Sequence, residues 1–296
     1  MRRMRVLLTV GMLLVLFVPV SPAEAKPLDG RIVYSDIFGD SGIYSIDPDG
    51  SNRTHLVTGS GLHGPKWFPD GTGISFIADV GPRGRRSRLE AIDVDGANRR
   101  VIIGGKELPE GYRSIGSYSW SPDGTQLVLS LYSRTFGGAI FVSSSDGSSI
   151  TEILGNARIS EWSSQDRIVA VKGSGRLITF DPDGGNPVMM GIRGHDPAWS
   201  PDGTRIAFMC RRLPHADVCI VNADGTGLVN LTNSSQVDWT PSWSPDGSRI
   251  VWSRSKTLST QGNLRRMRAD GSASARITHT NTLLIDEYEP DWTVLA

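Results

Sequence analysis

The chain has 296 residues, with 31 lysines and arginines against 31 aspartates and glutamates, so its formal net charge is zero. Hydrophobic residues at 38% and charged residues at 21% argue against a disordered chain and against a basic nucleic-acid-binding protein. The 34 glycines and 17 prolines follow no three-residue period, which indicates many turns rather than collagen. Because two cysteines cannot hold a chain of this length together, we expect a globular fold with a buried core.

The N-terminus has the three parts of a secretory signal peptide. Three arginines precede an uncharged apolar run from Val6 to Val20, and Ala23-Glu24-Ala25 follows as a small-x-small cleavage site. The apolar run is shorter than a typical spanning helix of about 20 residues. We predict a signal peptide over residues 1–25 and one domain over residues 26–296. The protein is then periplasmic or extracellular, without stable membrane insertion; the alternative is an uncleaved membrane anchor.

A repeated turn signature organises the rest of the chain. Trp followed by Ser or Phe and then Pro-Asp-Gly occurs in four intact copies, at Trp67, Trp120, Trp199 and Trp243. A degraded copy follows Trp162, and Trp292 comes after Glu289-Pro290-Asp291. Pro, Asp and Gly at the second, third and fourth positions suit a type I turn, so each copy predicts a tight hairpin.

A second turn signature alternates with the first. Asp-Gly preceded by two variable residues occurs six times, at Asp49, Asp95, Asp146, Asp183, Asp224 and Asp270. Short β-rich runs such as Gln126–Leu129 and Arg249–Trp252 lie between the two kinds of turn. Each unit of roughly 45 residues therefore contains four antiparallel strands, and an array of such units is typical of a β-propeller.

The two ends of the array are complementary. The first unit, residues 31–57, has only three strands, whereas the tail around Trp292 supplies a single strand. We predict that the C-terminal strand pairs with the N-terminal blade, which gives an all-β, six-bladed propeller of four-stranded antiparallel blades and closes the ring. Closure also removes sheet edges that invite aggregation.

The repeats resemble those of a known family. The segments from Pro197 to Gly203 and from Pro241 to Gly247 read Pro-x-Trp-Ser-Pro-Asp-Gly, like the Pro-Asp, WD-like repeats of TolB-like proteins. The resemblance covers nearly all of the chain after the signal peptide. It implies a six-bladed propeller in the cell envelope or outside the cell, with protein binding as its usual role. We expect the propeller domain alone, as a monomer.

The alternating turns define two faces. The tight turns share one face, where Asp and Gly serve the backbone, and the variable loops share the other, where function is expected. By the resemblance, the strand that ends at each Trp is innermost, so the residue four before each Trp should ring the mouth of the central channel. These residues are His63, Gly116, Arg158, His195, Trp239 and Tyr288. Asp196 lies in the same loops.

Several chemistries are open to these mouth residues. The histidines can simply hydrogen-bond neighbouring loops, or they can join Arg158, Asp196, Trp239 and Tyr288 in a ligand or peptide site. A metal is not expected, because His63 and His195 enter the ring three blades apart and so face each other across the channel. Hydrolase and nucleotide-binding motifs are absent from the sequence. We predict a non-catalytic binding module without a cofactor; the alternative is a metal-dependent lyase or lactonase.

Two further features are local. Arg83, Arg85, Arg86 and Arg88 crowd one variable loop, which is either a solvated loop or a contact for an acidic envelope or extracellular protein or an anionic glycan. Nucleic acid is not expected as a partner. Cys210 and Cys219 fall on adjacent antiparallel strands, so an oxidising compartment would join them in a disulfide; two buried free thiols are the alternative.

Overall fold

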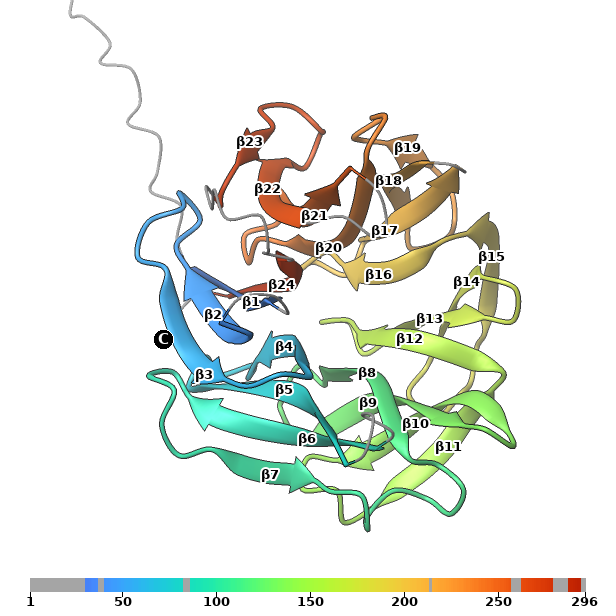
Figure 1. Ribbon diagram of the computed structural model, residues 1–296. Coiled ribbons are helices and arrows are strands. Elements are labelled where there is room, and N and C mark those ends of the chain that lie inside the picture. Colours follow the sequence, from blue (N-terminus) through green and yellow to red (C-terminus); the bar gives the residue numbers. More distant parts are fainter. Residues whose placement is uncertain are drawn as a thin grey trace, which may run out of the picture.

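A computed structural model of the protein describes residues 30–36, 40–81, 86–212, 215–256, 262–278 and 287–293. These segments are strands joined by turns and loops (Figure 1). No helix in them is long and apolar enough to cross a membrane. The predicted signal peptide lies outside the described residues.

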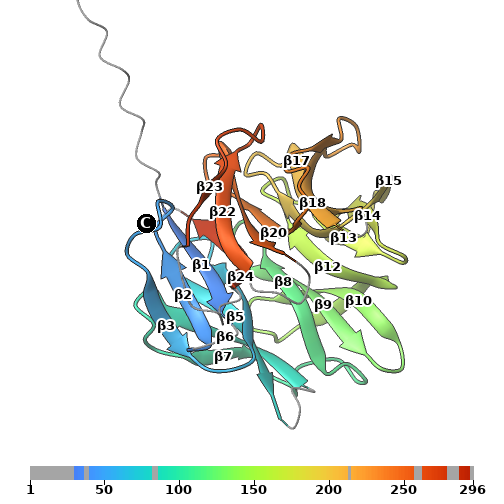
Figure 2. The same cartoon turned by 45° about the horizontal axis from the view of Figure 1, so that its top comes forward.

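The strands form antiparallel sheets arranged around a common centre in chain order, as Figures 1 and 2 show. Four sheets have four strands each, which run in this order from the innermost strand outwards: β24 (Glu287–Thr293), β1 (Arg31–Asp36), β2 (Gly42–Ile46) and β3 (Thr54–Thr58); β4 (Leu62–Trp67), β5 (Gly73–Val80), β6 (Arg86–Asp93) and β7 (Arg100–Ile103); β8 (Ser114–Trp120), β9 (Gln126–Ser133), β10 (Gly137–Ser144) and β11 (Ile150–Gly155); β12 (Ala157–Trp162), β13 (Ile168–Lys172), β14 (Arg176–Phe180) and β15 (Val188–Arg193). The protein is therefore an all-β propeller of four-stranded antiparallel sheets.

The fifth sheet differs from the six separate sheets that the sequence predicts. It has eight strands: β16 (His195–Trp199), β17 (Arg205–Arg212), β18 (His215–Asn222), β19 (Val229–Asn230), β20 (Val237–Trp243), β21 (Arg249–Ser255), β22 (Gly262–Arg268) and β23 (Ala275–Arg276). Within it, β18 and β20 share one parallel bridge, between Ala216 and Val237. All its other strand pairs are antiparallel.

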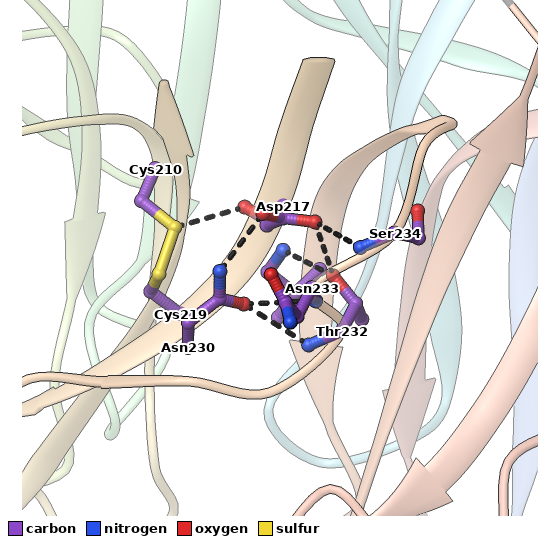
Figure 3. Close-up of a disulfide and its surroundings, with 8 residues drawn as sticks. Cys210, Asp217, Cys219, Asn230, Thr232, Asn233 and Ser234 are labelled. Carbon is purple, nitrogen blue, oxygen red and sulfur yellow. Dashed lines mark hydrogen bonds between the residues drawn. A yellow bond between two sulfur atoms is a disulfide. The ribbon is translucent and has the colours of Figure 1, made fainter. Parts of the chain in front are cut away.

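A buried carboxylate explains this bridge. Asp217 is 3% exposed and accepts hydrogen bonds from Asn230 Nδ2 at 2.8 Å, Thr232 Oγ1 at 3.2 Å and the Ser234 backbone N–H at 2.8 Å (Figure 3). These bonds hold the connection after β19 against β18. The following strand, β20, is thereby delivered beside β18.

The last strand of the chain lies in the first sheet. β24 pairs antiparallel with β1, with Ile32 opposite Trp292 and Val33 opposite Asp291. The innermost strands also contact one another in turn: β4 with β8, β8 with β12, β12 with β16, β16 with β20, β20 with β24 and β24 with β4. The two ends of the described chain are thus held together in one sheet.

The tight turns have the predicted conformation. In each of ten Asp-Gly turns the Asp side chain accepts a hydrogen bond from the backbone N–H two residues later, as in Asp70 with Thr72 and Asp246 with Ser248. The following glycine has a φ between 66° and 94°, a left-handed conformation that glycine adopts without steric cost. In the degraded copy, Asp166 takes this position with a φ of 56°.

The hydrophobic core lies between neighbouring sheets. It divides into six clusters, each built from residues of two adjacent four-strand sets, as when Val33 and Ile43 pack with Trp67 and Phe76. Five of the signature tryptophans are buried, with 4% to 8% of their surface exposed: Trp67, Trp162, Trp199, Trp243 and Trp292. Their role is therefore packing between sheets.

Candidate functional site

The innermost strands share an irregularity that shapes the channel. In each of β4, β8, β12, β16 and β20 the pairing register shifts just before the signature Trp, and the partner of β24 shifts in the same way. The residue three before the Trp has a positive φ in five of the six strands: Gly64 at 58°, Ile159 at 50°, Asp196 at 49°, Thr240 at 45° and Glu289 at 53°. A β-branched residue seldom adopts this conformation, so the bulge is imposed by its surroundings.

These bulges surround a cavity of about 310 Å³ in the centre of the propeller. All six innermost strands contribute to its lining. Its charged and aromatic lining residues are Lys66, Tyr118, Tyr132, Glu161, Asp196 and Glu289. Prolines and isoleucines complete the wall, which therefore combines apolar surface with a few ionisable groups, as ligand cavities commonly do.

Side chains just before the tryptophans join neighbouring innermost strands. Asp291 accepts the Trp67 backbone N–H at 2.9 Å, and Glu161 accepts that of Trp199 at 2.5 Å. Lys66 occupies the same position on β4 and cannot accept such a bond. Its ammonium instead lies 3.2 Å from Asp291 Oδ1 and 3.6 Å from Glu161 Oε1. This ion cluster lies between the cavity and a second hollow of about 220 Å³ on the tight-turn side.

The ion cluster perturbs the pKa values of its members. Burial lowers the pKa of Lys66, but the charges of Asp291 and Glu161 outweigh this and raise it above its usual value. Burial raises the pKa of Glu161 despite the nearby ammonium of Lys66. Each charge therefore depends on its partners, because a buried charge without a counter-ion is costly.

A second group of ionisable side chains lies nearer the loop face. Glu289 Oε2 accepts the Gly64 backbone N–H at 2.5 Å and lies 3.9 Å from His63 Nδ1. Burial, and then the charge of Glu289, raise the pKa of Asp196 to about 7. Burial lowers the pKa of His63, but a hydrogen bond to Asp79 and the charge of Glu289 raise it by more. This part of the cavity can therefore change charge near neutral pH.

The structure separates the predicted mouth residues. Asp196 lines the cavity, and His63 lies beside it through Glu289. Arg158 instead donates from Nη1 to the Gly173 carbonyl at 3.1 Å. His195 and Trp239 are half-buried and are not among the lining residues; Tyr288 lies in β24, but its side chain is outside the described residues.

The bulge explains the difference. It brings the residue three before each Trp into the cavity, whereas the sequence prediction used the residue four before it. Sequence reasoning accordingly missed Glu289, and it also missed Lys66 and Glu161, one residue before their tryptophans. A scan of all positions before the repeated Trp for charged residues would have found them.

A hairpin on the loop face adds exposed aromatic surface next to the cavity. Tyr132, which lines the cavity, is 37% exposed, and Phe136 in the turn between β9 and β10 is 65% exposed. Gly116 faces the Tyr132 ring so closely that a Cβ there would collide with it. The glycine therefore makes room for the ring. We call Tyr132 and Phe136 the aromatic hairpin.

The arginine-rich loop is described only in part. Arg83 and Arg85 lie outside the described residues, whereas Arg86 is exposed at the start of β6. Arg88 and Arg99 both donate to Glu90, which is 1% exposed. Arg88 therefore already neutralises a buried carboxylate.

The predicted disulfide is present. Cys210 on β17 and Cys219 on β18 are bonded, with their Cα atoms 5.7 Å apart (Figure 3). They are diagonal rather than directly opposite neighbours, because Cys210 pairs with Asp217 and Cys219 with Phe208.

Comparisons with known proteins support the fold. No family model matches the sequence. TolB from Acinetobacter baumannii has a TM-score of 0.69 at 19% identity, over 89% of this chain and 66% of that one. A putative TolB from Agrobacterium tumefaciens has a TM-score of 0.69 at 16% identity, over 90% of this chain and 98% of that one. An oligogalacturonate lyase in complex with manganese has a TM-score of 0.59 at 16% identity, over 86% of this chain and 75% of that one. The chain thus has a TolB-like propeller fold and spans about two thirds of the Acinetobacter protein.

Proposed function

We propose that this protein is an exported, non-catalytic binding module that holds an envelope or extracellular partner on its loop face, over the central cavity. The observation that carries the proposal is the cavity itself, which draws on every innermost strand and opens beside the aromatic hairpin. Exposed aromatic side chains next to a partly apolar hollow are typical of interface hot spots. The arginine-rich loop could add contacts with an acidic protein or an anionic glycan.

A capture experiment tests the location of the binding surface. Protein carrying Tyr132→Ala and Phe136→Ala should recover fewer envelope partners than wild type does. Val188→Ala with Met189→Ala is the matched control, because these apolar residues are 41% and 50% exposed on the outer strand β15. Equal recovery by all three proteins would remove the aromatic hairpin from the binding surface and leave the arginine-rich loop as the next candidate.

The scaffold is best read as six blades. The eight-stranded sheet divides at its one parallel bridge into two antiparallel sets, which supports a count of six. Pairing of β24 with β1 supports a ring closed by the C-terminal strand. Deleting residues 286–296 should then lower both the urea midpoint and the cooperativity of unfolding. Unchanged unfolding would contradict closure.

Export is supported by the leader-like N-terminus and by the disulfide, which is typical of oxidising compartments. N-terminal sequencing of envelope or medium protein should begin at Lys26. Thiol labelling under denaturing, non-reducing conditions should then find no free thiol. A cytoplasmic protein that begins at Met1, with two labelled cysteines, would contradict export.

The competing function is a metal-dependent lyase or lactonase that works at the channel. A fold like that of a manganese-bound oligogalacturonate lyase favours it. The described residues contain no group of three His, Cys, Asp or Glu placed to hold a metal ion. Elemental analysis of the purified protein separates the two functions. Stoichiometric metal that is lost in His63→Ala or His195→Ala, together with lyase activity, would favour the enzyme.

A further inference from the structure

The loop-face part of the cavity is rich in acceptors for a cation. Asp196 on β16 and Glu289 on β24 both line it. Among the described lining residues Lys66 is the one cation, and its ammonium is already bound between Asp291 and Glu161. His63 approaches Glu289 at 3.9 Å from outside the lining. Two carboxylates therefore share at most one partial positive charge.

A buried hydroxyl in the same cavity lacks a partner. Ser160 on β12 is 4% exposed and lines the cavity, and its Oγ has no hydrogen-bond partner among the described residues. The equivalent position, two before the Trp, holds a proline or a tyrosine on the other five innermost strands: Pro65, Tyr118, Pro197, Pro241 and Pro290. An unsatisfied buried hydroxyl costs about 1–3 kcal/mol, so its presence here points to a ligand that completes it.

Apolar surface lies between these polar groups. Ile77, Ile159 and several prolines line the cavity, together with the rings of Tyr118 and Tyr132. Alkyl stems that carry a charged end pack well on such walls, and aromatic faces attract cations. The cavity therefore suits a ligand that has an apolar stem and a small charged head.

We propose that this cavity binds a primary ammonium group on an alkyl stem, with Asp196 and Glu289 as charged acceptors and the Ser160 hydroxyl as a further acceptor. The inference rests on the proposed function and specifies its ligand chemistry. An ammonium has three N–H donors and needs acceptors rather than a full coordination shell. A divalent metal would need more ligands, and the described residues offer no group of three candidates for one. The ammonium can come from a lysine of a partner protein or from a free diamine.

Binding of this kind depends on pH. Asp196 faces Glu289 on β24 and the Thr240 backbone N–H on β20, with Lys66 and His63 on β4 and Glu161 on β12 around the same cavity. Since burial raises the pKa of Asp196 to about 7, this carboxyl is ionised at about pH 8 and largely protonated at about pH 5.5. His63 gains charge over the same interval. Both changes weaken attraction for a cation as the pH falls.

Calorimetric titration of the full mature chain with n-butylammonium chloride tests the inference. We expect binding at about pH 8 that weakens at least about tenfold at about pH 5.5, and about tenfold in Asp196→Asn or Glu289→Gln at about pH 8. Glu289→Gln keeps an acceptor for Gly64, and thermal unfolding verifies that each variant is folded. Glu110→Gln, an exposed carboxylate in the loop between β7 and β8, is the matched control and should bind as wild type does.

Peptide arms identify the source of the ammonium. Acetyl-Gly-Lys-Gly-amide should bind and its norleucine analogue should not; tighter binding of the lysine peptide than of cadaverine indicates a protein lysine, and the reverse a free diamine. Equal binding of the norleucine peptide, or unchanged affinity in Asp196→Asn and Glu289→Gln, would overturn the inference. If partner capture still depends on the aromatic hairpin in that case, the proposed function stands and only the ammonium assignment falls.

Discussion

The acidic residues of the tight turns and those of the channel behave in opposite ways. Turn aspartates such as Asp70, Asp202 and Asp246 have lowered pKa values, because hydroxyl and backbone hydrogen bonds stabilise the carboxylate. Asp196 and Glu161 in the channel have raised pKa values, chiefly because burial penalises the charge. Repetition marks the first group as part of the fold. The second group occurs once each and opposes the stability of its surroundings, which is typical of functional sites.

Removing the cation of the channel should have the largest effect. Lys66→Met leaves Glu161 and Asp291, 19% and 18% exposed, without their counter-ion, and should lower the free energy of unfolding by about 3 kcal/mol. Lys66→Arg should retain most of the stability. Urea unfolding at neutral pH measures both, with Lys106→Met on an exposed turn as the control. Equal stability of Lys66→Met and the control would show that the channel carboxylates need no partner.

Neutralising Asp196 should stabilise the protein, and only at higher pH. Its folded pKa of about 7 lies above the ordinary 3.8, so the folded state binds more protons between these values, and stability falls as the pH rises from about 4 to about 7. Asp196→Asn should therefore gain about 2 kcal/mol at about pH 8, after allowance for partial solvent access, and almost nothing at about pH 4.

Unfolding at several pH values checks this gain. Glu110→Gln should show no such dependence on pH. A loss of stability in Asp196→Asn at about pH 8 would mean that its carboxylate supports the fold, as the turn aspartates do.

Cutting one turn should have the smallest effect, with the opposite dependence on pH. Asp246→Ala removes hydrogen bonds from Ser244 Oγ and from the Ser248 N–H and Oγ, and should cost about 1 kcal/mol at neutral pH. Because the folded pKa of Asp246 lies below 3.8, its contribution is complete above that value and is lost as the pH falls through the folded pKa. Asp246→Asn keeps an acceptor and should lose less; equal losses in both variants at neutral pH would argue for charge over hydrogen bonding.

The sequence predicted the parts of the molecule that local chemistry determines. Pro-Asp-Gly turns, the strands between them and the proximity of Cys210 to Cys219 all follow from neighbours in the chain. The channel did not follow, because its bulges place Ile159 and Thr240 in a backbone conformation that their own preferences oppose. The bridge from Lys66 to Glu161 spans nearly a hundred residues and leaves no local signal.

The merging of two strand sets into one sheet was also beyond the sequence. It depends on Asp217, whose three hydrogen-bond donors lie 13 to 17 residues later in a loop without a repeated motif. An aspartate in a strand otherwise made of apolar residues was the available signal. Buried aspartates of this kind need partners, and the sequence does not say which.

Photo-crosslinking in cells tests most directly whether the partner binds at the loop-face cavity. Benzoylphenylalanine replaces Tyr132, which lines the cavity, or Val94, which is 44% exposed in a tight turn on the opposite face. The proposed function predicts a crosslinked partner from position 132 and none from position 94. Crosslinks from position 94 alone would place the binding surface on the tight-turn face and contradict it.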